Sequence, residues 1–323
     1  MPGFMDEHND FKGWGFPNVW VKGKLGKVDV TLGNFYEQFG SGFILRSYEE
    51  RSLGIDNSLL GAHIAASPLK GVTLKVLSGM QRNYWVLNKG AVSGADIEIG
   101  LDNYFPRMQE NGVILAMGGS WVNKYEKDDD FIMASPTFRL RLPEFTNAFD
   151  ARMRYQQKGI SLLAEYAWKS QDPNTLNNFI YQNGHAELFS MTYSVKGLSI
   201  LAQAKRSENM GFRSKRTDHP SSKASYINHL PAFTVDQTYA LPALYPYATQ
   251  MEGEWAYQAS AAYKFKGRYA PKFKINFSRV NGLENARKNV TDATVVGTQG
   301  YHSDFWRNGG KYYQDLDLMY EHK

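Results

Sequence analysis

Charged side chains recur at every second position in two stretches of the chain. Asp96 and Glu98 alternate with isoleucines, and Arg152 and Arg154 alternate with apolar residues such as Met153. Successive side chains of a β-strand point to opposite faces, so each stretch would have one apolar and one charged face. A charged face of this kind can attract or exclude ionic solutes by their charge. Discrimination would then arise from the charge and width of a lumen, not from a reaction.

A second group of charges lies in residues 33–57, a segment that does not alternate. Its charged residues of interest are Arg46, Glu49, Glu50 and Arg51. Arg46 precedes Glu49 and Glu50 by three and four residues, so a helical turn would pair them. Gly40-Ser41-Gly42 permits backbone conformations that are closed to other residues. Two interpretations stay open: a charged element that lines and constricts a pore, or a salt-bridged insert that fills it.

The chain offers little for catalysis or metal binding. Its seven histidines are scattered, and none has the i, i+4 spacing of a helical zinc site. Asp128-Asp129-Asp130 lacks the further spaced carboxylates and the glycine of a calcium loop. Ser41 lies between glycines, but the G-x-S-x-G pattern of a hydrolase is absent. We therefore predict no enzymatic activity, no cofactor and no metal site.

Composition excludes several other classes of protein. No cysteine is present, which removes thiol chemistry and disulfides. The 37 basic and 32 acidic residues are interspersed, and the net charge of +5 gives no nucleic-acid footprint. Residues 213–216 and 264–274 are interpreted as solvated loop ends or turns. Hydrophobic residues make up 42% of the chain, yet no apolar run approaches the roughly 18–20 residues of a membrane helix.

Stretches of strand length, joined by tight turns, would position these charges. The sequence predicts strands at 19–25, 28–36, 59–66, 72–77, 96–105, 113–125, 138–142, 149–156, 160–168, 186–195, 198–204, 255–265, 273–277 and 312–320. Short turns alternate with long polar stretches at 170–184, 208–247 and 281–310. Short turns at one end and long loops at the other are typical of an outer-membrane barrel, whereas a compact soluble sandwich seldom has such loops.

Aromatic residues cluster toward the ends of the predicted strands. Trp255 and Tyr257 lie at one end of a strand, and Tyr263 and Phe265 lie at the other. This spacing suits two interfacial girdles one bilayer apart. The simpler alternative is that aromatic residues are generally favoured in strands.

Residues 34–62, NFYEQFGSGFILRSYEERSLGIDNSLLGA, carry a family resemblance. This string, with NVWVKGK before it and GVTLKVLSGMQR after it, resembles an uncharacterised family of Bacteroidetes outer-membrane β-barrel proteins. ALPALYPYATQMEGE at 240–254 is similar to the same family, although the match is specific mainly over residues 10–85. The resemblance implies location and architecture but no mechanism. Members have a signal peptide and further sequence ahead of this start, so we expect an incomplete barrel, truncated at both ends.

The fold class predicted is all-β, an antiparallel transmembrane β-barrel of the outer-membrane type, with residues 1–323 forming one domain. The expected function is porin-like passage or uptake of small solutes, in contact with outer-membrane lipid and with no nucleic-acid partner. The lumen would be lined by Asp96, Glu98, Arg139, Arg141, Arg152, Arg154, Glu165, Lys272 and Lys274. An alternative is a structural barrel, plugged by its own loops, that anchors or assists an envelope protein complex. An outer-membrane enzyme is the third reading.

Overall fold

One antiparallel sheet of thirteen strands dominates the described part of the chain. The computed structural model describes residues 16, 18–50, 55–83, 86–129, 132–135, 137–219, 225–235, 246–267, 270–285 and 303–322. The strands lie in the order β1 (Trp20–Leu25), β2 (Val28–Phe35), β7 (Leu59–Ala66), β8 (Val72–Asn83), β9 (Val86–Gly100), β10 (Ile114–Tyr125), β13 (Phe145–Gln157), β14 (Ile160–Lys169), β15 (Gly184–Val195), β16 (Leu198–Glu208), β17 (Gly253–Lys264), β18 (Lys272–Asn285) and β19 (Ser303–Glu321). Every strand pairs with its neighbours in this sequence-ordered meander, which confirms the all-β antiparallel fold class.

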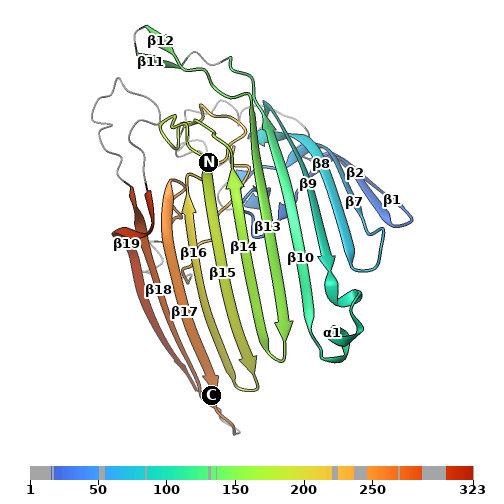
Figure 1. Cartoon of the computed structure of the whole chain (residues 1–323), viewed down its shortest axis with the longest axis vertical. Helices are drawn as coiled ribbons and strands as arrows, with labels where there is room; N and C mark the ends of the chain where they lie inside the picture. The colour runs from blue at the N-terminus through green and yellow to red at the C-terminus, as the bar shows by residue number, and fades with distance from the viewer. Residues whose placement is uncertain are drawn as a thin grey trace.

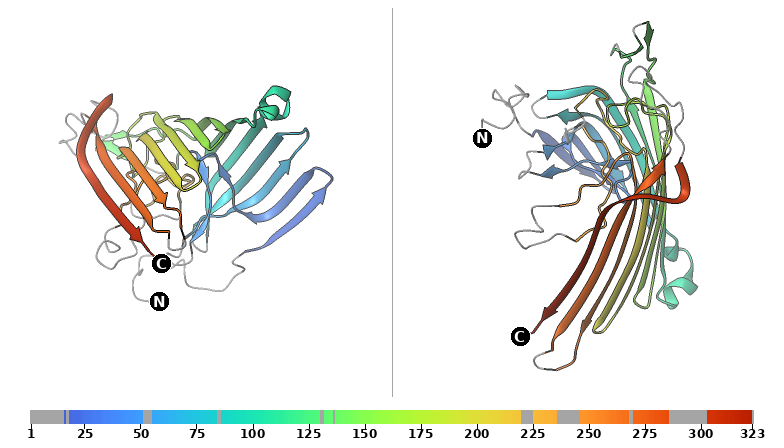
Figure 2. Two further views of the ribbon diagram at one scale, coloured as in Figure 1. Left: turned by 90° about the horizontal axis from the view of Figure 1, so that it is seen from below. Right: turned by 90° about the vertical axis from the view of Figure 1, so that its left-hand side faces the viewer.

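The sheet is long, tilted and curved into a trough (Figure 1). Its edges are β1 and β19, and within the described residues each of these strands pairs on one side only. Seen from below in Figure 2, the strands form an arc that encloses the remaining segments. Among the described residues, no α-helix combines the length and the apolar character needed to cross a membrane.

Each strand of the main sheet overlaps a predicted one, although β8, β18 and β19 are longer than predicted, and two predictions need a further correction. The strand predicted at 96–105 starts ten residues earlier and ends at Gly100, followed by a 3-10 turn (Leu101–Asn103) and the short helix α1 (Pro106–Glu110). Proline is well suited to the first turn of a helix, so the chain leaves the sheet there. The strand predicted at 138–142 is only β12 (Phe138–Arg139), paired with β11 (Met133–Ser135) outside the main sheet.

The concave side of the sheet is filled near the end with the long connections. The inserted segments, residues 37–50, 55–58, 170–183, 209–219 and 225–235, lie there (Figure 2). They include two pairs of two-residue strands, β3 (Gln38–Phe39) with β4 (Leu45–Arg46) and β5 (Glu49–Glu50) with β6 (Ile55–Asp56). An isolated bridge joins Arg213 to Tyr226. Side chains of the inserted segments form the hydrophobic core with inward residues of the wall, including Phe39, Phe43, Phe212, Leu77 and Val92.

The convex face carries large apolar side chains that are open to the surroundings. Ile97, Met153, Phe189 and Ile275 are 39%, 42%, 50% and 46% exposed, although each lies inside a strand. Aromatic residues gather toward both ends of this face: Trp121, Phe149 and Tyr166 toward one end, and Tyr263, Phe273 and Tyr320 toward the other. The sheet therefore buries its polar face and exposes its apolar face.

Candidate functional site

A charged cluster crosses three strands on the concave face. Arg152 of β13 places Nη2 2.6 Å from Asp96 Oδ1 on β9 and Nη1 2.8 Å from Asp150 Oδ1. Ser120 of β10 lies between them and donates its hydroxyl to Asp96 over 2.6 Å. Gly118 pairs with Arg152, and a Cβ at that glycine would lie 2.7 Å from the Arg152 guanidinium. The glycine thus leaves the space through which the arginine reaches across β10.

Two further predicted residues extend this cluster toward the open part of the trough. Arg154 Nη1 lies 3.9 Å from Glu98 Oε1, and Arg152 Nη2 lies 3.5 Å from Glu98 Oε2. The side chains of Glu98 and Arg154 are 38% and 54% exposed, whereas that of Arg152 is 6% exposed. We call Asp96, Glu98, Ser120, Asp150, Arg152 and Arg154 the charge ladder. Four of the eight predicted site residues belong to it.

The tip of one inserted segment docks beside the charge ladder. Glu165, which pairs with Arg152 in the β13–β14 register, accepts hydrogen bonds from the Ser41 backbone N–H (2.9 Å) and hydroxyl (2.5 Å). Gly40 adopts a φ of +52°, and a Cβ there would lie 2.6 Å from Glu165 Oε1. The close approach therefore requires glycine. Ser41 acts here as a docking residue.

Arg46, Glu49 and Glu50 lie elsewhere, and the helical turn predicted to pair them does not form. The chain turns at Gly42, where φ is +92°, and then pairs as short strands, so the i, i+4 geometry is lost. The Arg46 guanidinium lies 5.3 Å from the centre of the Tyr48 ring. Arg51 lies outside the described residues. The described part of 33–57 fills the trough, as Phe43 at 0% exposure illustrates.

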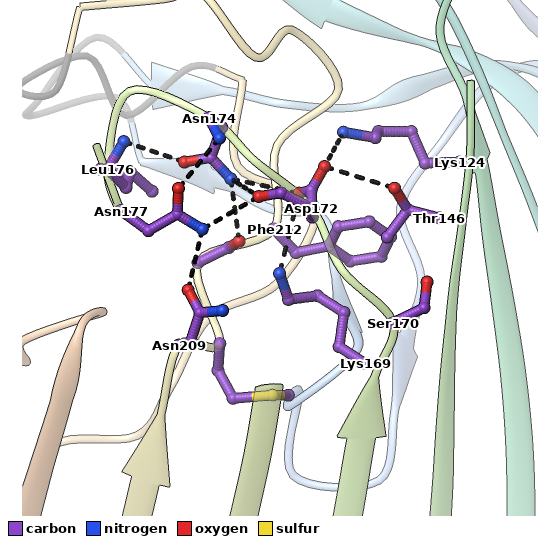
Figure 3. Close-up of polar contacts among 12 residues, drawn as sticks. Lys124, Thr146, Lys169, Ser170, Asp172, Asn174, Leu176, Asn177, Asn209 and Phe212 are labelled. Carbon is purple, nitrogen blue, oxygen red and sulfur yellow. Dashed lines mark hydrogen bonds and ion pairs between the residues drawn. The ribbon is translucent and has the colours of Figure 1, made fainter. Parts of the chain in front are cut away.

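Buried lysines anchor a second inserted segment. Lys124 Nζ lies 2.6 Å from Asp172 Oδ1, and Lys169 Nζ lies 3.8 Å from Asp172 Oδ2 (Figure 3). Both lysine side chains are 0% exposed. Burial alone would raise the pKa of Asp172, but the two ammonium groups outweigh it and lower that pKa. Asn174 and Asn177 hydrogen-bond around the same carboxylate and its backbone. We call this group the Asp172 cluster.

The arginines of residues 213–216 are buried, which contradicts the interpretation of this region as a solvated loop end. Arg213 and Arg216 are 0% exposed and are not solvated loop ends. Arg216 donates from Nε to Glu126 Oε2 and from its backbone N–H to Glu126 Oε1, each over 2.9 Å. Lys205, also fully buried, lies 2.7 Å from Glu254 Oε1. The ion pairs of Lys205 and Arg216 could not be found from local sequence, because their carboxylate partners lie 49 and 90 residues away and meet them only in the folded chain.

The family match covers residues 1–323. The chain belongs to DUF6029, a family of unknown function. No protein with a curated description matches the chain.

Several solved structures are similar to this DUF6029 chain. OccK2 (OpdF) of Pseudomonas aeruginosa, in complex with glucuronate, is 10% identical, with a TM-score of 0.38 over 94% of this chain and 80% of that one. A BenF-like porin from Pseudomonas fluorescens Pf-5 is 11% identical, with a TM-score of 0.38 over 95% and 77%. OccAB4 of Acinetobacter baumannii is 12% identical, with a TM-score of 0.44 over 81% and 59%.

The remaining predicted lumen residues of the DUF6029 chain lie away from the charge ladder. Arg139 belongs to β12, outside the main sheet, where its guanidinium lies 3.0 Å from Asp128 Oδ1. Arg141 follows β12 and lies outside the sheet as well. Lys272 and Lys274 lie at one end of β18, where Lys274 pairs with Met319. Asp150 and Ser120 were missed as site residues, although Asp150 has the same alternating position as Arg152.

Proposed function

We propose that this DUF6029 chain forms the wall of an outer-membrane β-barrel whose polar interior passes small solutes, in the manner of a porin, without catalysing a reaction on them. The observation that carries the proposal is the distribution of neighbouring side chains. Ile97 on the convex face is 39% exposed, while Asp96 on the concave face is 6% exposed. A protein in water seldom exposes so extensive an apolar surface, whereas lipid matches it. The resemblance to Bacteroidetes barrels supports the same location.

The charge ladder supplies the selective element of this proposal. Arg154 and Glu98 are the members open to the trough, and opposite charges at one level would discriminate solutes by their charge. Across β16–β18, Gln203 donates to Gln258 over 2.5 Å, and Gln258 donates to Asn276 over 2.9 Å. This part of the wall, separated from the ladder by β14 and β15, therefore offers neutral hydrogen-bonding groups. The inserted segments narrow the path, so only small solutes would pass.

A plugged scaffold is the second candidate, and the Asp172 cluster favours it. Two fully buried lysines on one carboxylate hold residues 170–183 firmly against the wall. Removing one partner from such a buried pair is strongly destabilising, so this segment would not leave easily. In this reading the barrel anchors an envelope protein partner.

Single-channel recording in planar bilayers separates the two candidates. Passage predicts current steps of reproducible size, with an ion selectivity that shifts when Arg154→Gln removes the exposed cation of the ladder. Lys196→Gln, in the distant β15–β16 turn, is the matched control and should leave selectivity unchanged. Silence from protein shown to be folded and inserted would reject passage. A co-purifying envelope protein would then support the scaffold.

A further inference from the structure

A cleft opens at the rim of the wall between β9 and β10. The two strands are paired as far as Ala91 and Tyr125, where β10 ends, while β9 extends further, to Val86. The space left there has a volume of about 690 Å³. We call it the rim cleft, and the lining residues that matter are Asn83, Leu87, Lys89, Tyr125, Lys127 and Lys215. The ends of β9 and β10 that border it are the upper ends of these two strands in Figure 1.

The floor of the rim cleft is firmly held. Asn88, which is 4% exposed, donates its amide to the Ser214 hydroxyl over 2.6 Å. A Cβ at Gly90 would lie 2.8 Å from the Ser214 carbonyl oxygen. The inserted segment that carries Ser214 is thus seated directly on β9. The backbone of β9 and of the segment that carries Ser214 therefore shapes this side of the cleft.

Cations line the rim cleft in excess of available anions. Lys89 and Lys127 are exposed, and neither has an ion-pair partner among the described residues. Lys215 lies 3.0 Å from Asp218. Of the carboxylates in the lining, Glu126 is already engaged by Arg216 and Lys124, which leaves Asp129. An anionic ligand would therefore meet two lysines that form no ion pair within the described part of the chain.

A buried amide in the same lining offers a hydrogen-bond acceptor. Asn83 is 7% exposed, and its Nδ2 donates to Asn88 and to Asp218. Its Oδ1 is buried and accepts no hydrogen bond in the described part of the chain. Buried polar atoms normally have a partner, so a ligand hydroxyl that donates to Oδ1 would complete the site.

The rim cleft also adjoins the apolar convex face. Tyr125 lies on that face with its ring 5.0 Å from the ring of Phe145, which is 59% exposed, and Leu87 is 37% exposed. Tyrosine side chains favour the boundary between hydrocarbon and headgroups, and lysines just beyond that boundary attract lipid phosphates. We propose that the rim cleft binds the headgroup of an amphiphile that carries a phosphate monoester and hydroxyl groups. The proposal rests on the membrane orientation in the proposed function, but not on solute passage.

The test uses the full chain refolded in dodecyl maltoside micelles, with native mass spectrometry to measure bound lipid. The probes are dilauroyl phosphatidic acid and, separately, inorganic phosphate. Lys89→Gln/Lys127→Gln is the test variant. Lys158→Gln/Lys196→Gln, at the turns of the opposite end, is the matched control. We expect wild type and control to retain phosphatidic acid. The test variant should bind this lipid at least about tenfold more weakly, because each lysine near a lipid phosphate contributes to the free energy of binding.

The outcomes are distinct. Equal retention by both double variants would overturn the site. Inorganic phosphate that displaces the lipid at equal concentration would show that free phosphate is the ligand and would overturn the lipid assignment. A second measurement addresses the hydroxyl: phosphatidylinositol phosphate should bind more tightly than phosphatidic acid to wild type, and Asn83→Leu should remove that difference. Circular dichroism checks that each variant is folded. The binding result does not depend on conductance, so a protein without channel activity could still bind the lipid.

Discussion

Two arginines on one face of one strand have different roles. Arg152 is buried between Asp96 and Asp150, whereas Arg154 is 54% exposed and its carboxylate partner lies 3.9 Å away. We expect Arg152→Ala to reduce the free energy of unfolding by about 3–5 kcal/mol, because it leaves buried carboxylates without a counter-charge. Arg154→Ala should cost less than about 1 kcal/mol. Urea unfolding in lipid vesicles measures both. Equal losses would contradict the assignment of Arg152 to a buried ion cluster.

Glu37 gives the protein an acid-sensitive contact. It follows β2, and its carboxylate lies 2.8 Å from His63 Nε2 and 2.9 Å from Lys75 Nζ. Burial would raise the pKa of Glu37, but hydrogen bonds from His63 and Lys75 outweigh it and lower the pKa to about 2. The contribution to stability is thus present above the unfolded-state pKa and is lost as the pH falls from about 4.5 toward 2.

The variant Glu37→Gln tests this contact. Relative to wild type, its free energy of unfolding should be lower by about 2–3 kcal/mol at pH 7, and the two proteins should converge near pH 2. The measurement is denaturant unfolding at a series of pH values. A difference that stays constant with pH would show that the carboxylate is not held ionised by its neighbours.

Whole strands, more than single residues, were predictable from the sequence. Alternation placed Asp96 and Arg152 on the same face, and tight turns such as Gly26-Lys27 separated the strands correctly. The first half of β9 was missed because its residues between Val86 and Ala95 are rich in glycine, alanine and serine, which give no contrast between faces. The short β12 shows the reverse error: a strand-like composition without a partner in the main sheet.

The faces of β15 give a paired test of which side meets lipid. Phe189, in the middle of the strand, is 50% exposed on the convex face, and Ser190 follows it on the concave face. Phe189→Arg should lower the free energy of unfolding in vesicles by about 2–4 kcal/mol, the cost of an arginine on a lipid-facing strand. Ser190→Arg should be mild, because the concave face is polar. Tryptophan fluorescence during urea unfolding measures the stability of both variants. A larger loss for Ser190→Arg than for Phe189→Arg would show that the concave face, not the convex face, meets lipid.

The whole molecule depends on contacts that no local pattern encodes. Ser41 meets Glu165 across 124 residues, and Asn228 donates to the carbonyl of Phe43 across 185. These contacts fold the inserted segments into the trough, so the sequence could predict long connections but not whether they fill or line the interior. The charge ladder was found only in part for a different reason: strand alternation places Ser120 and Asp150 on its face but does not show which residues of that face contact Arg152. Its strands were predictable, whereas the docking of Gly40 and Ser41 beside it was not.

The absence of cysteine allows the orientation of the whole sheet to be tested with one thiol at a time. Gln258 faces the trough and hydrogen-bonds to Gln203, whereas Ala259, the next residue of β17, is exposed on the convex face. In vesicles, Gln258→Cys should react with a membrane-impermeant methanethiosulfonate, because water can reach a polar interior. Ala259→Cys should stay unmodified, because lipid covers it, and should react fully once the vesicles are dissolved in urea and detergent. The opposite pattern would mean that the concave face meets lipid, and it would overturn both the barrel and the lumen assigned to the charge ladder.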